Sequence, residues 1–350
     1  MAHGPDPAAP RPPREGGRRA HFPSHHAAPR NCYAALDLGT NNCRLLIARP
    51  AEDGFVVVDA FSRIVRLGEG LATSGELSEA AMDRAVSALS VCSDKLRRRR
   101  VSLVRSVATE ACRRASNGRE FVQRVYRETG IALEIISAEQ EARLAVLGCH
   151  ALLEPGEGNA LVFDIGGGST ELILIDAGQS PPRVIDWFSA PWGVVSLTET
   201  EPHVGHDRDG LLTSYARMRG RVADSFAQFA ARLQPDARPR RLLGTSGTVT
   251  TLASVHLDLP SYDRRQIDGL IVPVAAMRDI STRLAGMSVS ERAELPCIGQ
   301  ERADLVVAGC AILDAILDIW PAERLGVADR GIREGILRSL MARDRARNLM

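Results

Sequence analysis

Apolar residues along this chain gather in short runs separated by polar turns, a pattern typical of paired β-strands. The clearest case is an apolar run that ends at Asp164, gives way to three glycines at 166–168, and resumes at Leu172–Ile175. The second run is too short and too rich in branched side chains for a helix, so it predicts a strand. Residues 163–176 therefore predict two strands joined by an acidic, glycine-rich turn.

The same pattern occurs earlier, over residues 33–48, where an Asp37-Leu38-Gly39-Thr40 turn separates two apolar runs. A single Asp-Gly turn is commonly structural, but two turns with Asp two residues before Gly indicate a duplicated phosphate-binding fold. A third glycine turn, at 244–248, follows a short apolar run and precedes a helical pattern. Taken alone it is equally consistent with an ordinary helix cap, because Ser and Thr satisfy free N–H groups at helix starts.

The residues of these turns indicate phosphate chemistry. Glycine has no Cβ, so the backbone can bend sharply and bring its N–H groups close to an anion. Asp37 and Asp164 stand at strand ends, where a carboxylate can hold a hydrated metal ion. A dinucleotide fingerprint or a P-loop needs a helix directly after the glycines, and a P-loop also needs Gly-Lys-Ser/Thr. Neither pattern is present.

Between and around the hairpins, the pattern predicts further strands and helices. Strands are expected at 54–60, 62–67, 101–109 and 132–136, and helices at 78–96 and 121–129. Ser78 and Ser137 stand where helix caps are expected, each just before an apolar helical pattern. Four arginines at 97–100 follow the first helix. A solvated helix end explains them, and a polyanion contact is the functional alternative.

Several stretches in a fixed order carry a family resemblance: Asp37–Arg44, Thr109–Arg113, Glu134–Leu144, Asp164–Leu172, Gly244–Leu252, Glu301–Leu305 and Asp329–Gly335. Together they resemble the exopolyphosphatase and guanosine-pentaphosphate phosphohydrolase family, a branch of the actin, sugar kinase and Hsp70 superfamily. The resemblance implies an α/β fold of two actin-like, ribonuclease H-like domains around a central cleft. It places the first domain at 31–139 plus 325–350 and the second at 140–324.

The resemblance also implies a site and a reaction. Glu141 takes the place of the family's general base, which activates the water that attacks a terminal phosphate of polyphosphate or guanosine pentaphosphate. Magnesium is the implied cofactor, with Asp37, Asp164 and Glu171 as its ligands. The implied substrate-binding residues belong to the glycine turns or are arginines: Gly39, Thr40, Asn41, Arg44, Arg113, Gly166, Gly167, Gly168, Ser169, Ser246 and Arg302.

Two positions beside the expected base depart from the family pattern. Gln140 replaces the first acid of the Glu-Glu-Ala-Arg element, and Ala138 replaces a glycine. The glutamate at the second position keeps the chemistry available, and its altered neighbours bear on its orientation and pKa. Two other functions therefore stay open on sequence: a polyphosphate or alarmone sensor with little turnover, and an ATP-dependent small-molecule kinase of the same superfamily.

The amino-acid composition limits which binding partners and which cellular compartment we expect. The chain has 350 residues, 45% hydrophobic content and a net charge of +1, so about two domains are expected and polyanion binding must come from local basic clusters. Seven scattered cysteines without a Cys-x-x-Cys pair indicate reduced thiols in a cytoplasmic protein. Neither a specific nucleic acid nor a membrane is expected as a partner, and the resemblance allows for a homodimer.

Residues 1–30 differ from the rest of the chain. They are rich in proline and arginine and nearly free of aliphatic residues, which predicts a disordered tail. They lack the apolar core of a signal peptide, and no later stretch has the apolar length of a membrane span. A dispensable extension and a basic arm that touches polyphosphate are the two interpretations of this tail.

Overall fold

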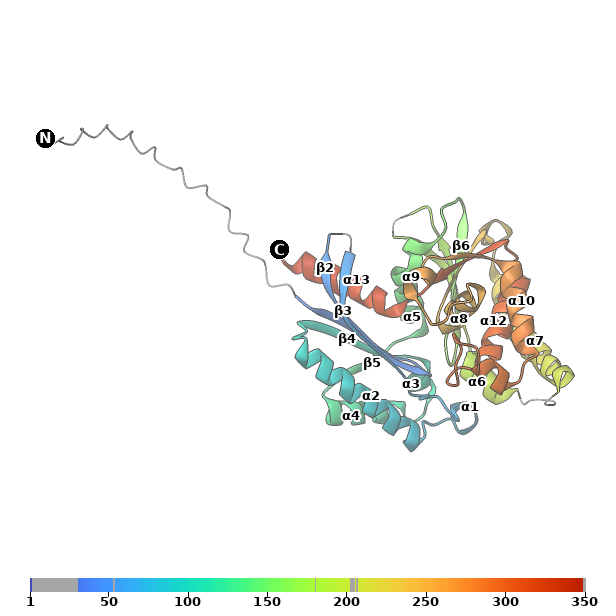
Figure 1. The fold of residues 1–350 in the computed structure, drawn as a ribbon, viewed down its shortest axis with the longest axis horizontal. Helices are drawn as coiled ribbons and strands as arrows, with labels where there is room; N and C mark the ends of the chain where they lie inside the picture. The colour runs from blue at the N-terminus through green and yellow to red at the C-terminus, as the bar shows by residue number, and fades with distance from the viewer. Residues whose placement is uncertain (2–30, 53, 180, 202–204, 206, 349–350) are drawn as a thin grey trace. The chain divides into compact units, whose positions relative to one another are not determined.

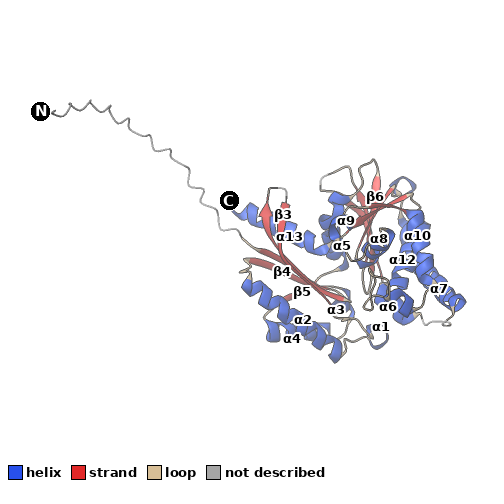
Figure 2. Ribbon diagram, in the orientation of Figure 1, coloured by secondary structure: helices blue, strands red, loops and turns tan. Residues whose placement is uncertain are grey.

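A computed structural model of the chain has two β-sheets with helices packed on their faces (Figures 1 and 2). The structure describes Met1 and residues 31–348, except for 53, 180, 202–204 and 206. The predicted tail at 1–30 lies, apart from Met1, outside the described residues.

Five strands form the first sheet in the spatial order β3-β2-β1-β4-β5. Their bounds are Tyr33–Leu38 for β1, Asn42–Ala51 for β2, Gly54–Ile64 for β3, Leu103–Ala108 for β4 and Leu133–Ile135 for β5. β1 pairs antiparallel with β2 and parallel with β4. The two strands expected at 54–60 and 62–67 are one continuous strand, which pairs with β2 across an irregularity at Ile47/Ala48.

The second sheet repeats this order as β8-β7-β6-β9-β11, with β10 added beyond β11. Its strands are Asn159–Ile165 for β6, Thr170–Asp176 for β7, Arg183–Ala190 for β8, Arg241–Thr245 for β9, Ile271–Pro273 for β10 and Arg324–Ala328 for β11. β6 pairs antiparallel with β7 and parallel with β9, as β1 does with β2 and β4. This duplication of one five-stranded unit confirms the predicted α/β class of two actin-like domains.

The helices lie between and outside the sheets (Figure 1). In the first half of the chain they are α1 (Leu71–Ser74), α2 (Glu79–Arg98), α3 (Glu110–Arg114), α4 (Gly118–Thr129) and α5 (Ala138–Cys149). In the second half they are α6 (Val194–Thr200), α7 (Arg208–Arg232), α8 (Gly247–His256), α9 (Arg264–Ile267), α10 (Val274–Ala285), α11 (Val289–Ala293), α12 (Val306–Ile319) and α13 (Ile332–Asn348). Two short 3-10 helices follow α5 and α7, at His150–Leu152 and Pro235–Ala237.

Alternation along the central strands directs side chains to two separate cores. Ala34 and Leu36 of β1 pack toward α2 and α4, whereas Tyr33 and Ala35 face α13. In the second sheet, Leu161 of β6 packs toward α7, α10 and α12. The opposite face, with Val162 and Ile173, packs against α5. Because α5 and α13 also pack against each other, they form a helical layer between the two sheets.

Two predicted domain boundaries differ from this arrangement. Residues 325–328 were assigned to the first domain, but they form β11, which pairs parallel with β9 in the second sheet. The chain returns to the first sheet only with α13. The boundary at 139/140 falls inside α5, a helix whose residues contribute to the cores against both sheets.

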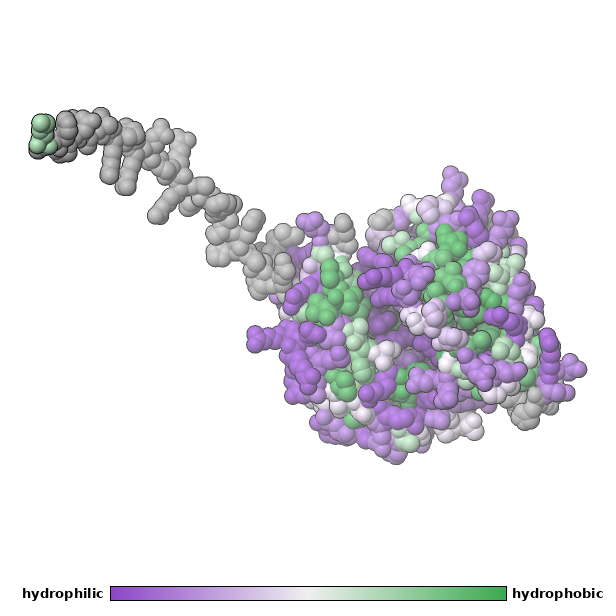
Figure 3. Space-filling model, in the orientation of Figure 1, coloured by the Kyte–Doolittle hydropathy of each residue, from purple (hydrophilic) through white to green (hydrophobic). Residues whose placement is uncertain are grey.

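The face drawn in Figure 3 and the state of the cysteines agree with what the amino-acid composition led us to expect. On the face drawn in Figure 3, hydrophilic residues cover most of the surface and apolar residues form smaller areas. All seven cysteines are free thiols. Among the helices of the described residues, none combines the length and apolar character needed to cross a bilayer.

Candidate active site

A cleft is lined by residues from both glycine hairpins and from the third turn. All but one of the predicted site residues contribute to its lining: Asp37, Gly39, Thr40, Asn41, Arg44, Glu141, Asp164, Gly166, Gly167, Gly168, Ser169, Glu171, Ser246 and Arg302. Arg113 is the exception. Segments that are far apart in the sequence therefore meet at one place, as the duplicated hairpins led us to expect.

The two glycine turns close in the same way. The Gly39 N–H donates to the Asn42 carbonyl at 2.9 Å, and the Gly166 N–H donates to the Ser169 carbonyl at 2.9 Å. Both donors are therefore used inside the turns, which corrects the expectation that Gly39 and Gly166 bind phosphate through their N–H groups. The donors without a partner among the described residues belong to the next positions of each turn: Thr40, Asn41, Gly167 and Gly168.

The turns also approach each other closely. A Cβ on Gly167 would lie 3.0 Å from the Thr40 Cβ and 3.1 Å from the Asn41 nitrogen. A Cβ on Gly168 would lie 2.7 Å from the Thr40 hydroxyl oxygen. Neither glycine has a positive φ, so a close approach between the turns, rather than a left-handed bend, requires glycine here.

Four carboxylates lie around the turns: Glu141 and Glu171 are buried, and Asp37 and Asp164 are partly buried. Across the hairpins, Asp37 is opposite Arg44, whereas Asp164 is opposite Glu171. Burial raises the pKa of Asp37, and it raises the pKa of Asp164 to about 6, with Arg44 opposing both shifts. Burial and the Asp164 charge raise the pKa of Glu171 to about 7. The fourth carboxylate, Glu141, is described next; together they give the cleft an excess of negative charge that favours a cation.

Glu141 lies in the first turn of α5 and is 6% exposed. Ser137 Oγ accepts the Gln140 N–H at 3.2 Å, and Gln140 Oε1 accepts the Ser137 N–H at 3.0 Å. Glutamine thus completes the capping box as glutamate does, so the departure at 140 leaves the helix start intact. Burial and the charge of Glu171 raise the pKa of Glu141 well above its ordinary value, and Arg113 opposes this shift.

Arg113 holds Glu141 rather than facing the cleft. Its Nη1 donates to Glu141 Oε2 at 3.0 Å and to the Ile136 carbonyl at 2.8 Å, and its Nη2 donates to Glu110 Oε2 at 2.6 Å. This guanidinium is engaged by two carboxylates, and the phosphate contact expected for Arg113 stays a prediction. We place Arg113 as a positioning residue for Glu141.

The third turn is more than a helix cap. Ser246 has φ 108°, a rare conformation for a residue with a side chain, and its side chain makes no capping hydrogen bond to α8. Its hydroxyl oxygen is buried without a partner among the described residues. Strain and an unpaired polar atom at a cleft are typical of a ligand-binding position. Arg302 also lines the cleft, and its Nη1 donates to Thr251 Oγ1 at 3.0 Å.

The carboxylate and amide oxygens in the cleft suit a hydrated magnesium ion. Magnesium prefers oxygen ligands and keeps several waters. Oδ1 of Asp37 and Oδ1 of Asn41 are buried and unpaired in the described part of the chain, whereas Glu171 Oε1 accepts from Ser169 Oγ at 2.7 Å and Ser189 Oγ at 2.9 Å. No three acidic, His or Cys side chains among the described residues converge to hold a metal directly. Contacts through water therefore suit this site best.

Sequence reasoning missed several lining residues, chief among them Asp329–Arg333 at the start of α13. This segment was part of the family resemblance, yet no site residue was predicted in it. Glu110 and Thr245 also line the cleft. Hydrophobic periodicity contains no signal for them, because it marks which faces pack and not which polar side chains face a cavity.

An ion pair joins the loop beside the first turn to the segment that carries Arg302. Arg66, which has φ 46°, bonds through Nη1 to Asp304 Oδ2 at 2.9 Å. The loop that carries Arg66 also donates to the first turn, since the N–H groups of Arg66 and Gly68 bond to the Asn41 and Thr40 carbonyls at 3.0 and 2.9 Å. The Arg66–Asp304 pair therefore links the first glycine turn to the segment that carries Arg302.

For a short polyphosphate, the substrate that the family resemblance implies, we expect Arg66→Ala to raise KM by roughly two- to fivefold with little change in kcat, because a partly exposed ion pair contributes about 0.2–1 kcal/mol. Steady-state kinetics at low and high salt measure this, and the effect should shrink as salt rises. The charge-swapped double variant Arg66→Asp with Asp304→Arg should recover much of the loss. Arg124→Ala is the matched control, since its partners Glu79, Asp83 and Glu128 all lie away from the cleft. An unchanged KM in Arg66→Ala contradicts the linking role.

Comparison with known sequences identifies the family. The chain matches the sequence model of the Ppx/GppA phosphatase family over residues 46–344. The chain belongs to this family. Exopolyphosphatase 2 of Mycobacterium tuberculosis is 32% identical over 320 residues, which cover 88% of this chain and 98% of that protein. The guanosine-5'-triphosphate,3'-diphosphate pyrophosphatase of Aeromonas salmonicida is 31% identical over 315 residues, covering 88% of this chain but 59% of that protein.

Solved Ppx/GppA structures share the fold. A crystal structure of the Aquifex aeolicus family member superposes with a TM-score of 0.74 at 29% identity, over 90% of this chain and 98% of that one. An exopolyphosphatase from Cytophaga hutchinsonii superposes with a TM-score of 0.80 at 25% identity, over 89% and 98%. The resemblance found in the sequence is confirmed on both counts, family and architecture.

Proposed function

We propose that this protein hydrolyses phosphoanhydride bonds and releases the terminal phosphate of inorganic polyphosphate or guanosine pentaphosphate. One observation carries the proposal: the buried carboxylate of Glu141 lines the same cleft as the two glycine turns. In these turns the N–H groups of Thr40, Asn41, Gly167 and Gly168 have no partner within the described part of the chain. Free N–H groups bind phosphate oxygens, and a nearby carboxylate can accept the proton of an attacking water.

In this proposal the chain positions the substrate and neutralises its charge. Phosphoryl transfer passes through a loose transition state with charge on the peripheral oxygens, so fixed donors contribute most of the catalysis. The four turn N–H groups and Arg44 bind successive phosphates. Asp37 and Asp164 would hold magnesium through water, and the ion would supply charge neutralisation when bound. Glu141, oriented by Arg113, takes the proton from the water that attacks the terminal phosphorus.

Polyphosphate is our first choice of substrate. The relatives that this chain matches along nearly their whole length have exopolyphosphatase names, including one from Haemophilus influenzae that the match covers to 90%. The Aeromonas pyrophosphatases extend well beyond the matched region. Both substrates end in the same phosphoanhydride, so the catalytic residues serve either one. The cytoplasmic location and the homodimer stay predictions from the sequence.

Phosphate release assayed in parallel with polyphosphate, guanosine pentaphosphate and ATP, each with and without magnesium, tests the proposal. We expect magnesium-dependent release from polyphosphate, with release from guanosine pentaphosphate as the second activity. Binding without turnover indicates a sensor, and ATP consumption only with a hydroxyl acceptor indicates a kinase. Either result contradicts the proposed hydrolysis.

A further inference from the structure

Two arginines of the cleft, Arg333 and Arg44, have no hydrogen-bond or ion-pair partner among the residues that the structure describes. Arg333, the second residue of α13, lines the cleft and makes no hydrogen bond or ion pair with any described residue. Arg44 lines the same cleft and is likewise without such a partner. Burial lowers the pKa of Arg333, and the like charge of Arg44 lowers it further, while Glu334 and Asp37 oppose the shift.

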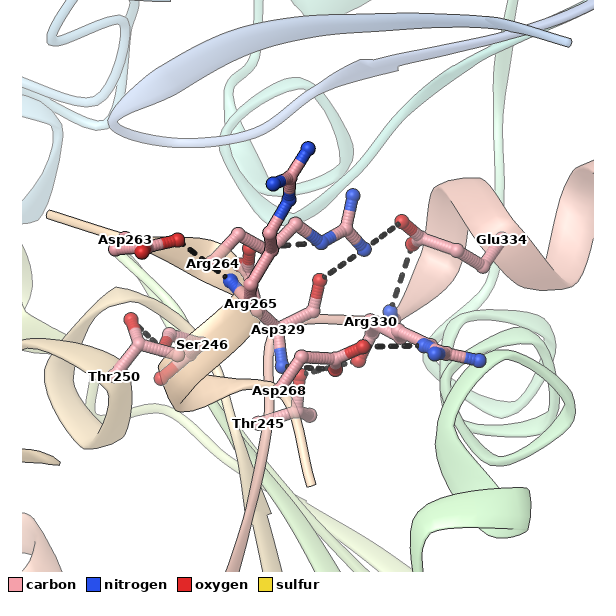
Figure 4. A network of polar contacts seen from close by, with 11 residues as sticks. Thr245, Ser246, Thr250, Asp263, Arg264, Arg265, Asp268, Asp329, Arg330 and Glu334 are labelled. Carbon is pink, nitrogen blue, oxygen red and sulfur yellow. Dashed lines mark hydrogen bonds and ion pairs between the residues drawn. The ribbon is translucent and has the colours of Figure 1, made fainter. Parts of the chain in front are cut away.

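The neighbouring arginines are different, because their charges are already paired. Arg330 Nε donates to Asp268 Oδ2 at 2.6 Å, and Asp268 Oδ1 accepts the Asp329 N–H at 3.0 Å. Arg264 donates to Glu334 Oε1 at 2.9 Å and to the Asp329 carbonyl at 2.7 Å. Figure 4 shows these contacts as one network around the start of α13. Within this segment, the guanidinium of Arg333 is the one left for a ligand.

The same network fixes where Arg333 stands. Glu334 Oε2 accepts the Gly331 N–H at 2.9 Å, and Thr245 Oγ1 donates to the Arg330 carbonyl at 2.7 Å (Figure 4). A Cβ on Gly148 would lie 1.9 Å from the Gly331 carbonyl oxygen, so α5 and the start of α13 touch through their backbones. Since α5 carries Glu141, the network holds Arg333 and Glu141 in a fixed relation to each other.

We propose that Arg333 is a further substrate-binding residue, which together with Arg44 binds phosphoryl oxygens of the substrate in the cleft. The assignment rests on the proposed function for the identity of the anion. Two guanidinium groups present flat, bidentate donor sets that match phosphate oxygens. Without a ligand they repel each other in a partly desolvated site, and a bound phosphate relieves that repulsion.

If Arg333 binds phosphate, its removal should weaken ligand binding without lowering stability. If Arg333 only stabilised the fold, its removal should lower stability instead. Arg333→Met removes a partly buried charge that makes no hydrogen bond or ion pair with a described residue, and Glu334 keeps its contact with Arg264, so the ligand-free protein should melt close to the wild-type temperature. Binding of non-hydrolysable imidodiphosphate should weaken by at least about tenfold, since a charge-assisted, bidentate contact is lost. Arg333→Lys keeps a positive charge but not the paired donors, and should weaken binding several-fold.

Arg278→Met is the matched control. It removes a guanidinium of α10 that is paired with Asp318 at 3.0 Å and is not part of the cleft lining, so its melting temperature should fall slightly while its affinity for imidodiphosphate stays close to wild type. Isothermal titration with imidodiphosphate and thermal melting of the four proteins provide both readouts. Wild-type affinity in Arg333→Met or in Arg333→Lys overturns the assignment.

The outcome separates this inference from the proposed function. If wild type binds imidodiphosphate and Arg333→Met does not, while neither polyphosphate nor guanosine pentaphosphate is hydrolysed, the assignment holds and the proposed reaction fails. If wild type hydrolyses polyphosphate and Arg333→Met does so with the same KM, the assignment alone fails.

Discussion

Replacing Glu141 by glutamine should reduce turnover by about 10²- to 10⁴-fold, the usual contribution of a general base. Glutamine keeps the shape of the side chain and can still accept the hydrogen bond from Arg113, but it cannot accept a proton at neutral pH. Binding should change little, because it depends on the turn N–H groups and on Arg44. Phosphate release and imidodiphosphate affinity, measured on the same preparation, separate the two effects.

Glu139→Gln is the matched control for this variant. It lies in the same helical turn, but its side chain is 47% exposed and pairs with Arg143 at 2.7 Å. Its turnover should stay within about twofold of wild type, since exposed ion pairs contribute little. If Glu141→Gln keeps more than about a third of wild-type turnover, the base is another residue, and Glu110, which also lines the cleft, is the next to test.

The pH profile gives an independent check on the same residue. Glu141 must be ionised to act as a base, so turnover should fall as pH falls through its pKa. Burial and the Glu171 charge raise that pKa, which places the acid limb above the range of an ordinary glutamate. Arg113 lowers the pKa of Glu141, so Arg113→Met should move the limb to still higher pH. A limb that does not move in Arg113→Met contradicts the positioning role of that arginine.

Gly167→Val should reduce turnover by about 100-fold or more while the protein stays folded. A Cβ at this position would lie 3.0 Å from the Thr40 Cβ and 3.1 Å from the Asn41 nitrogen, so the two turns must move apart. Their unpaired N–H groups then no longer converge on one phosphate chain, and a misplacement of about 1 Å can reduce catalysis 10²-fold. Turnover and circular dichroism together distinguish this from unfolding.

Gly220→Val is the matched control for the turn variant. Gly220 lies in α7, and a Cβ there would meet no atom within 4 Å. The control should therefore keep wild-type turnover, with at most a small change in stability from helix propensity. Near-wild-type turnover in a folded Gly167→Val protein would mean that the contact between the turns is not needed for substrate binding.

The sequence predicted the hairpins well because their signals are local. Apolar runs on both sides of Asp37 and Asp164 indicated strands, and the glycines between them marked the turns. The strand β11 was placed in the wrong domain because its pairing with β9 joins residues 325 and 242, a non-local contact that short-range periodicity does not encode. The tight contact between Gly167 and Thr40 was likewise invisible, since it forms only when the two hairpins meet.

The same difference between local signals and non-local contacts applies to the site residues. Glu141 was found through the family resemblance and not through its own pattern, because one acid in a first helical turn is ordinary. Arg113 and Arg333 are both arginines in stretches that carry the family resemblance, so the sequence does not tell their environments apart. In the structure Arg113 pairs with two carboxylates, whereas Arg333 pairs with none of the described residues. Which arginine faces the ligand depends on where the acids of distant segments lie, and only the folded chain specifies that.

In the proposed reaction, water activated by Glu141 attacks the terminal phosphorus of the substrate. Hydrolysis of polyphosphate in ¹⁸O-labelled water, followed by mass spectrometry of the products, tests this step. We expect the label in the orthophosphate that the wild type releases, and little labelled product from Glu141→Gln. Label at the new end of the remaining chain, or transfer of phosphate without label from water, contradicts it.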